Sequence, residues 1–548
     1  MKKQSFISSS FILIVSVILS KITGALFRIP LANMLGGTGM AYFGGAYGLF
    51  LPVYAVFVTG LSAASAKLTA ESAVLYGEDG VRQVKKYSLL LFTGAGVAGT
   101  IIMLLLARPF SVYVAGSEQI YLSVLIIAPS VFFGCITAAY RGCAEGRQNM
   151  YPTAVSQIIE SVVKLVFGLA ICMIIIKNEK YFSGLFGEIC DDASAVAAAG
   201  AVAGVTLSSF FGMLYMIFSQ NFSDRKHKEN GFIPCSRSGK EVMKNLVVTV
   251  VPVAVSALLT NLTSLVDLCT IMRYIDDSVK SAPEYFETRY SFINEIGTEK
   301  FSSFAYGAFS GMAVTIFNLV PSLTNMFGRG IFPAAAAAWA VKDTRALTQN
   351  AADVLKITSL VSVPAGLGIC VMSRQILCTL FPSSANEAVF CVDSLRYLGI
   401  AVIFLCISFP VFSMLQAVGR ADIPAKIMLA GVTVKLAGNM VLVRIPALNA
   451  SGAAVSTGIC YAMMLVMSLF FFIKHTKIRL NLFKLFYGPV YSGLMCMAAA
   501  WLIRNVAGRY ADDAVTLVAS VLGGGAVYLV FLFLLGEYKF LSDMTKHK

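Results

Sequence analysis

Charged side chains lie inside segments of the chain that are otherwise apolar. Lys21 and Arg28 belong to the first such segment, Glu160 and Lys164 to a later one, and Asp267 to a third. A charge in the hydrocarbon core of a membrane is costly, so such residues usually face a cavity or each other. Arg binds phosphate through two parallel hydrogen bonds, and Lys binds it as a point charge. The excess of cations therefore predicts a positively charged cavity and a phosphate-bearing substrate.

The predicted substrate-binding residues are polar side chains within apolar segments: Arg28, Lys21, Lys67, Asp267, Glu160, Lys164, Asn33 and Asn261. Two acid–base pairs, Lys67 with Glu71 and Glu160 with Lys164, have a spacing of four residues, which places both partners on one helical face. Each pair is either an internal salt bridge that neutralises charge for membrane insertion or a part of the substrate site.

The arginines differ in their surroundings along the chain. Arg28 has no acid nearby in its own segment, so its counter-charge must come from another helix, such as from Asp267, or from a ligand. Arg141 and Arg147 instead fall in a predicted inner loop. We therefore expect Arg28 to have a role in substrate binding.

Transmembrane helices must position these residues. The 548-residue chain is 57% hydrophobic and 13% charged, whereas a soluble domain carries roughly a quarter charged residues. Apolar runs of about 18 or more residues indicate membrane spans. The runs predict about fourteen spans, at residues 6–34, 42–75, 86–107, 119–140, 152–176, 194–219, 243–272, 302–338, 350–372, 392–417, 423–443, 449–473, 485–505 and 514–536. The fold class is therefore an all-α polytopic membrane protein.

The two halves of the sequence resemble each other. Residues 60–71 read GLSAASAKLTAE, and residues 330–341 read GIFPAAAAAWAV. A GR pair, a Pro and a VKL triplet follow one another in residues 146–165 and again in residues 419–436. Several matches in the same order predict two parallel six-helix repeats. Parallel repeats place a substrate site near the membrane midplane between the halves.

The repeat defines the expected domains. We predict an N-terminal six-helix half at 1–228, a C-terminal half at 229–475, and two extra helices with a tail at 476–548. The halves differ in charge, because Lys67 aligns with Ala337, whereas Lys164 has a counterpart in Lys435. The intramembrane charge is therefore concentrated in the N-terminal half.

The positive charges are distributed as in a membrane protein. The net charge is +14, but the cations are spread through short loops between apolar runs, where Lys and Arg fix membrane orientation. Nucleic acid is therefore not the expected partner. The loop bias places both termini in the cytoplasm, and we expect a multi-pass protein of the bacterial cytoplasmic membrane that works as a monomer among membrane lipids.

The sequence carries no motif of an enzyme or an ATPase. It has no GxxxxGK[ST] loop for ATP, and its three histidines fall in predicted cytoplasmic segments. No Ser/His/Asp or metal-ligand pattern is present. We therefore predict no metal, no cofactor and no catalytic residues, and a transporter rather than an enzyme.

Several stretches carry a family resemblance. They read SKITGALFRIPLANMLGGTGMAYFGGAYGLF, GLSAASAKLTAE, YRGCAEGRQNMYPTAVSQIIESVVKL and NLTSLVDLCTIMR. The chain resembles the stage V sporulation protein B-like and MurJ-like branch of the oligosaccharide flippase superfamily. This resemblance covers roughly the whole chain and is weaker after about residue 475.

The resemblance implies export of a polyprenyl-pyrophosphate-linked saccharide, such as lipid II, by alternating access. It assigns Arg28 to the cavity arginine, Asp267 to the seventh-helix aspartate and Glu160 to the fifth-helix glutamate. One departure is the region of Met312, where relatives often carry a basic residue. The implied partners are a lipid-linked oligosaccharide and membrane lipids.

Two other functions stay open at this point. An ion-coupled multidrug exporter of the same superfamily typically has twelve spans and an acidic cation site. A membrane glycosyltransferase or ligase would need a catalytic acid in a sizeable outer loop. Only the predicted amphipathic outer element at about 273–301 is long enough, with Asp276, Asp277, Glu284 and Glu295.

Overall fold

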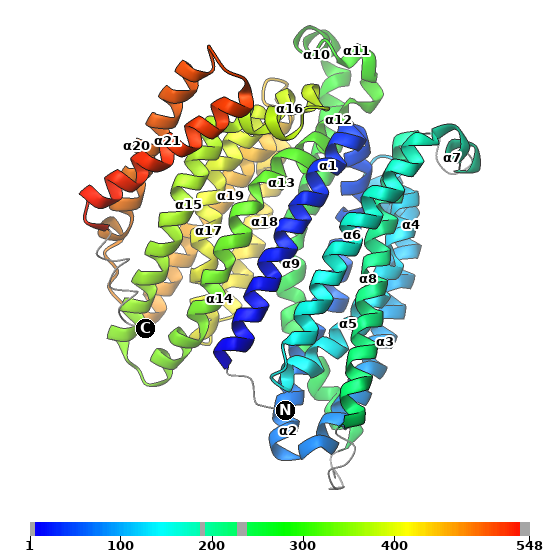
Figure 1. Ribbon diagram of the computed structural model, residues 1–548, viewed down its shortest axis with the longest axis vertical. Coiled ribbons are helices and arrows are strands. Elements are labelled where there is room, and N and C mark those ends of the chain that lie inside the picture. Colours follow the sequence, from blue (N-terminus) through cyan, green and yellow to red (C-terminus); the bar gives the residue numbers. More distant parts are fainter. Residues whose placement is uncertain (1–5, 187–191, 227–237, 538–548) are drawn as a thin grey trace. The chain divides into compact units, whose positions relative to one another are not determined.

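The computed structural model describes residues 6–186, 192–226 and 238–537, and every regular element in them is a helix (Figure 1). The predicted all-α class is therefore confirmed. The chain divides into two compact units, Met1–Cys269 and Thr270–Lys548. The division falls within α9 (Gly239–Ser281), so this helix contributes to both units. The predicted boundary at residue 228 lies outside the described residues.

The first unit contains the helices from α1 to α8 and most of α9, as far as Cys269. Its elements before α9 are α1 (Phe6–Tyr54), a π-helical segment (Ala55–Thr59), α2 (Gly60–Leu75), α3 (Gly77–Pro109), a second π-helical segment (Phe110–Val114), a 3-10 turn (Glu118–Ile120), α4 (Tyr121–Ile127), α5 (Pro129–Gly146), α6 (Tyr151–Lys177), α7 (Glu179–Phe186) and α8 (Ala193–Lys226).

The second unit continues from α9. Its elements are α10 (Pro283–Arg289), α11 (Ile293–Ile296), a 3-10 turn (Thr298–Lys300), α12 (Phe301–Ala308), a π-helical segment (Phe309–Ala313), α13 (Val314–Phe317), α14 (Leu319–Ala340), α15 (Thr344–Leu380), α16 (Ala385–Phe390), α17 (Val392–Ala417), α18 (Asp422–Leu442), α19 (Ala450–Thr476), α20 (Leu482–Ala507) and α21 (Asp513–Leu534).

Each predicted span falls largely on helical segments, but the count of fourteen stays a prediction. Eleven helices of the described residues are long and apolar enough to cross a membrane, or twelve if the pair Thr298–Phe317 and Leu319–Ala340, bent by 43°, forms one span. In this count Leu19–Leu75 is a single stretch of 57 residues.

That long stretch contains a break. The 49 residues of α1 would extend about 74 Å if straight, against a hydrocarbon thickness of about 30 Å. Gly36 interrupts the helix with φ 62° and ψ −170°, in the positive-φ region that favours glycine. Figure 1 shows α2 at the same end of the first unit as the beginning of α1. The chain therefore reverses after Gly36.

The two units repeat one packing pattern. In the first unit α6 packs on α8, α3 on α5 and α2 on α5; in the second, α18 packs on α19, α15 on α17 and α14 on α17. These are the pairs that two six-helix repeats in the same order would make. Small residues allow close approach: Gly204 of α8 lies against the backbone of Gly168 of α6, so a side chain at 204 would overlap it.

The last two helices form a hairpin that packs on α15. Small residues line the buried face of α20, including Gly488, Ser492, Gly493 and Cys496. Gly493 lies against Val363 of α15. The hairpin, which has no counterpart in the repeat, is therefore an integral part of the second unit.

The predicted outer element at 273–301 is divided between the end of α9 and a small aromatic cluster. Phe286 of α10 is fully buried and contacts Phe301, which in turn stacks on Phe304. Tyr290 accepts a hydrogen bond of 2.8 Å from the amide of Asn449. The cluster fixes this element to the second unit, so the element is a folded cap with an apolar interior.

Candidate functional site

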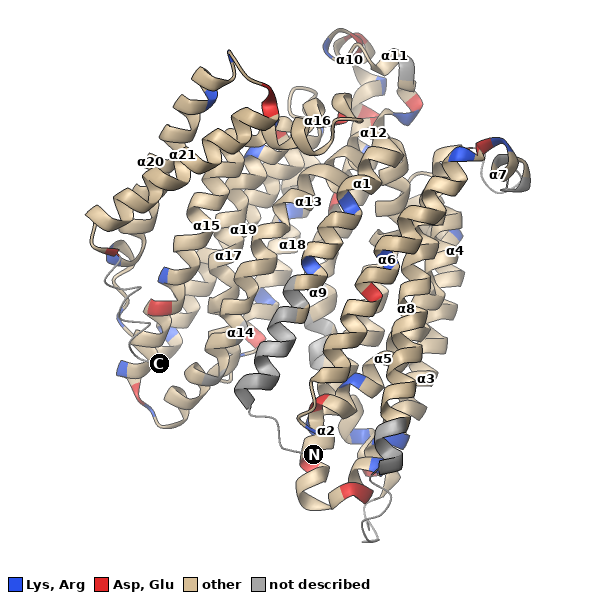
Figure 2. Cartoon of the chain, viewed as in Figure 1, with Lys and Arg blue, Asp and Glu red and all other residues tan. Residues whose placement is uncertain are grey.

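All eight predicted site residues belong to the first unit. Lys21, Arg28 and Asn33 lie on α1, Lys67 on α2, Glu160 and Lys164 on α6, and Asn261 and Asp267 on α9. Figure 2 shows basic positions along α1 and an acidic position on α6, whereas most charged residues gather toward helix ends. The intramembrane charges therefore occur on a small set of helices.

The structure brings three of the predicted cations together. Helices α1 and α6 pack against each other, and Ser16 donates a hydrogen bond of 3.3 Å to the side-chain carbonyl of Gln157. The Lys164 ammonium lies 5.7 Å from the centre of the Phe27 ring. It is also within electrostatic range of Arg28 and Lys21. Positive charge from two helices is thus concentrated in one region of the first unit.

The predicted interaction of Glu160 with Lys164 is not the one that forms. Glu160 instead accepts a hydrogen bond of 2.9 Å from Arg141, with 28% of the Glu160 side chain and 16% of the Arg141 side chain exposed. The expectation that Arg141 lies in a loop is also wrong, because α5 continues to Gly146. Arg141 therefore belongs to the charged region, although its place at the end of an apolar run did not indicate this.

The second predicted pair does form. Lys67 and Glu71 lie 3.9 Å apart on α2, with 61% and 47% of their side chains exposed. Exposed pairs of this kind contribute little stability, typically about 0–1 kcal/mol. An exposed polar face on a helix of an otherwise apolar protein is expected to face water rather than lipid. Lys67 is therefore accessible despite its partner.

The three remaining predicted residues, Asn33, Asn261 and Asp267, are less exposed than Lys67. The Asn33 amide donates to the carbonyl of Ile29 at 3.2 Å, and the Asn261 amide donates to the carbonyl of Ala257 at 2.8 Å. Each amide thus bonds the backbone of its own helix one turn earlier. Asp267 is 8% exposed on α9. The suggested pairing of Asp267 with Arg28 stays a prediction.

Aromatic residues extend from the charged region along the later part of α1. Phe43, Tyr47, Phe50 and Tyr54 form successive ring contacts, with centroids 4.9 Å, 5.8 Å and 5.1 Å apart. The Tyr47 hydroxyl is within electrostatic range of Arg28. The spacing of three or four residues on one helical face could have revealed this row in the sequence.

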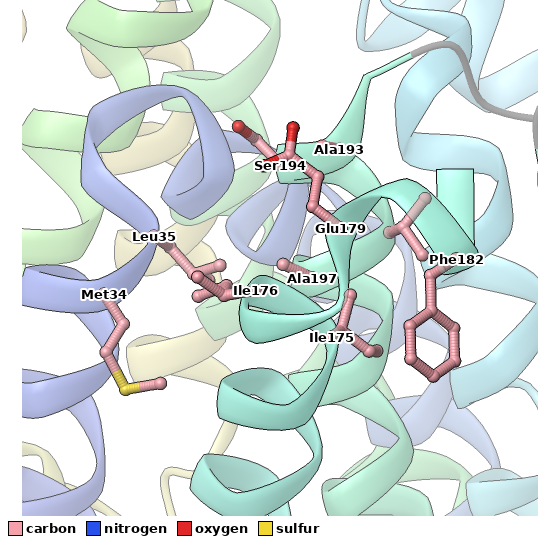
Figure 3. A pocket seen from close by; sticks show the side chains of 10 residues that line it. Met34, Leu35, Ile175, Ile176, Glu179, Phe182, Ala193, Ser194 and Ala197 are labelled. Carbon is pink, nitrogen blue, oxygen red and sulfur yellow. The ribbon is translucent and has the colours of Figure 1, made fainter. Parts of the chain in front are cut away.

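A small pocket lies near the break in α1 (Figure 3). It has a volume of about 160 Å³ and is lined mainly by apolar side chains of α1, α6, α7 and α8. The polar ends of Glu179 and Ser194 lie together at one edge (Figure 3). Pockets for drug-sized ligands measure about 300–1,000 Å³. This pocket is therefore smaller than a typical site for a drug-sized ligand.

The described residues also bear on metal and enzyme chemistry. Within these ranges, no three or more His, Cys, Asp or Glu side chains form a group able to hold a metal ion. In the outer element, Lys280 donates a hydrogen bond of 2.7 Å to Asp276, which raises the pKa of the Lys280 ammonium. Asp276, one of the acids on which an enzyme function would depend, is thus held in an exposed ion pair.

The fold and the charges within apolar helices define a multi-pass helical membrane protein. The chain belongs to the polysaccharide biosynthesis protein family, whose sequence model matches residues 6–339. The resemblance inferred from the motifs is therefore confirmed.

Characterised relatives cover nearly the whole chain. Stage V sporulation protein B of Bacillus subtilis (strain 168) is 22% identical over 540 residues, 97% of this chain and 96% of the relative. Lipid II flippase MurJ of the same organism is 21% identical over 556 residues, again 97% of this chain and 96% of the relative. The similarity to a lipid II flippase along nearly the whole chain confirms the prediction of a transporter.

Solved structures confirm the fold. A structure of lipid II flippase MurJ in an inward closed conformation matches with a TM-score of 0.67 at 15% identity, covering 96% of this chain and 98% of that one. An inward-facing multidrug resistance MATE family transporter of the MOP superfamily matches with a TM-score of 0.64 at 14% identity, covering 84% and 94%. Both transporter types thus share this architecture.

Proposed function

We propose that this protein exports a polyprenyl-pyrophosphate-linked saccharide from the inner to the outer leaflet of the bacterial cytoplasmic membrane by alternating access. Lipid II or a related lipid-linked oligosaccharide is the cargo, both termini lie in the cytoplasm, and the monomer is the working unit. The match to lipid II flippase MurJ along 97% of the chain supports this substrate class.

The concentration of Lys21, Arg28 and Lys164 is the observation that carries the proposal. Like charges in a medium of low polarity repel one another, so an anion among them lowers the electrostatic energy. A pyrophosphate offers two phosphate groups, which Arg28 binds bidentately while Lys21 and Lys164 act as point charges. The exposed Lys67 assists where the cargo enters.

The acidic and amide residues have supporting roles in this proposal. Asp267 balances the cations, Glu160 balances Arg141, and Asn33 and Asn261 contribute polar surface for the sugars. The lipid tail stays in the bilayer, so the site has to hold only the pyrophosphate and the saccharide.

The test is transport in proteoliposomes that contain purified protein and lipid II. The Arg28→Ala variant removes charge-assisted hydrogen bonds worth about 1.5–3 kcal/mol, so the export rate should fall by roughly 10- to 100-fold. Arg396→Ala is the matched control, because Arg396 forms an exposed 3.0 Å pair with Asp393 on α17. Its rate should equal that of the wild type.

An unchanged rate in Arg28→Ala would exclude Arg28 as the phosphate ligand. Proton- or sodium-coupled efflux of cationic dyes, without lipid II export, would instead assign the chain to the multidrug exporters. Complementation of a strain depleted of its lipid II flippase tests the cargo in cells.

A further inference from the structure

Helix α6 carries an acid–base pair that should form by local rules alone. Glu160 precedes Lys164 by four residues, which is the more favourable order for an ion pair on one helix. In surroundings of low polarity the attraction is stronger than in water. Glu160 nevertheless bonds Arg141 of α5, nineteen residues earlier, at 2.9 Å. The structure thus favours a tertiary pair over the local one.

Three helices build the tertiary pair. A second nitrogen of Arg141, Nε, donates a hydrogen bond of 2.9 Å to the hydroxyl of Ser156 on α6, and that hydroxyl donates to the carbonyl of Thr153 at 2.9 Å. On the other side, the Glu160 carboxylate lies against Gly212 of α8, where any side chain would overlap it. The guanidinium is therefore oriented by α6, and the carboxylate has space only because α8 carries a glycine.

This pair determines what surrounds Lys164. With its carboxylate bonded to Arg141, Glu160 forms no ion pair with Lys164, although it lies within electrostatic range of that ammonium. The Lys164 ammonium lies over Phe27 and within range of Arg28. We propose that Arg141 is a positioning residue that holds the Glu160 carboxylate in their shared ion pair, so that this carboxylate does not bond Lys164 and the Lys164 ammonium stays available to the anionic group of the cargo. The inference rests on the proposed function for the identity of that cargo.

Transport by matched variants tests the role of Arg141. In Arg141→Gln the part-exposed Glu160 carboxylate loses its partner and should turn to Lys164, because an uncompensated charge within a membrane span is costly. Lipid II export should then show a severalfold higher KM. The double variant Arg141→Gln with Glu160→Gln has no carboxylate to capture Lys164, so the KM should return toward the wild-type value. Arg141→Lys keeps the charge and should resemble the wild type.

The control is another arginine–glutamate pair of the same unit. Arg147 bonds Glu78 at 2.8 Å between the end of α5 and the beginning of α3. Arg147→Gln should leave the KM unchanged. If the double variant at 141 and 160 stays as impaired as Arg141→Gln, then Arg141 binds the cargo itself or serves the fold, and the proposal is wrong.

A measurement without cargo separates this inference from the proposed function. The rate at which an amine-reactive reagent labels Lys164 in purified protein is read by mass spectrometry of the Lys164 peptide. An ammonium paired with a carboxylate gives up its proton less readily, so labelling should slow severalfold in Arg141→Gln and recover in the double variant. Equal labelling in all three proteins overturns the positioning role. A wild-type protein that fails to export lipid II overturns only the proposed function.

Discussion

At the scale of single residues, Tyr528 satisfies a backbone group that a proline leaves without its usual partner. Pro364 of α15 has no N–H, so the carbonyl of Leu360, four residues earlier, loses its helical hydrogen bond. The Tyr528 hydroxyl of α21 donates to that carbonyl at 2.7 Å. A buried unsatisfied carbonyl costs about 1–3 kcal/mol. A side chain of one helix thus replaces a hydrogen bond that another helix lacks.

Replacing Tyr528 with Phe should therefore lower the free energy of unfolding by about 1–3 kcal/mol, because the Leu360 carbonyl stays buried without a donor. Thermal unfolding of purified protein in detergent measures the change. Tyr487→Phe is the control, because Tyr487 is 48% exposed on α20. Equal unfolding temperatures for the Tyr528 and Tyr487 variants would contradict this explanation.

The sequence indicates which charged residues lie in apolar segments, but it does not indicate which residues they pair with. Charges in apolar segments can be found because hydropathy is a local signal, and Lys21, Arg28 and Lys164 are all visible in this way. The partner of Glu160 is not, since a spacing of four indicates Lys164, whereas the packing of α5 on α6 brings Arg141. The apolar run that ends at about residue 140 predicts a loop for Arg141, although a helix need not end where its apolar residues do.

At the scale of helices, the C-terminal hairpin and the residues just after it bond α15 at three positions along that helix. Glu537, just after α21, pairs with Lys356 at 2.5 Å, with 11% and 18% of their side chains exposed. Tyr528 bonds the carbonyl of Leu360, and Arg504 of α20 bonds the carbonyl of Val371 at 2.8 Å. The attachments lie on both sides of Pro364. The hairpin therefore holds the proline-containing part of α15 in one conformation.

Loss of the ion pair between Lys356 and Glu537 should lower the free energy of unfolding. Lys356→Glu places two carboxylates together in a largely buried site, and removing one partner of such a pair typically costs about 3–5 kcal/mol. Adding Glu537→Lys to make the swapped pair should recover most of that loss. Unfolding temperatures in detergent measure both effects.

An exposed pair provides the control for this swap. Arg396 and Asp393 lie 3.0 Å apart on α17, with about half of each side chain exposed. Reversing the charge at this position, as in Arg396→Glu, should therefore change the free energy of unfolding by less than about 1 kcal/mol. If the swapped 356–537 variant is no more stable than Lys356→Glu, then the site depends on the original geometry rather than on charge pairing.

The positions at which helices break could not be predicted from the sequence either. Hydropathy predicts one run at 302–338, whereas the structure divides it among α12, a π-helical segment, α13 and α14. In α1 the break falls at Gly36, which hydropathy does not indicate. Whether a helix can lose a backbone hydrogen bond depends on which groups its neighbours can supply, as Tyr528 does for Leu360. That information belongs to the packed structure.

At the scale of the whole molecule, two repeats with one packing pattern carry unequal charge. All eight predicted site residues lie in the first unit, and Lys67 corresponds to Ala337 in the second. A charged site that changes its access from one side of the membrane to the other is subject to the membrane potential. Each elementary charge moved across the full potential is worth about 2.3 kcal/mol per 100 mV. A transporter of this kind can therefore use the potential without ATP.

The proposed function predicts in which direction the membrane potential changes the export rate. A pyrophosphate-linked cargo carries negative charge outward, which an inside-negative potential favours, and the empty cationic site is drawn back toward the inside by the same field. Proteoliposomes with a potassium gradient and valinomycin should export lipid II fastest when the inside, equivalent to the cytoplasm, is negative, more slowly at zero potential, and slowest when it is positive. A proton gradient imposed at zero potential is the control and should not restore the rate. Rates that follow the proton gradient and ignore the potential would show that a coupled ion, rather than the charge of the cargo and its site, drives export.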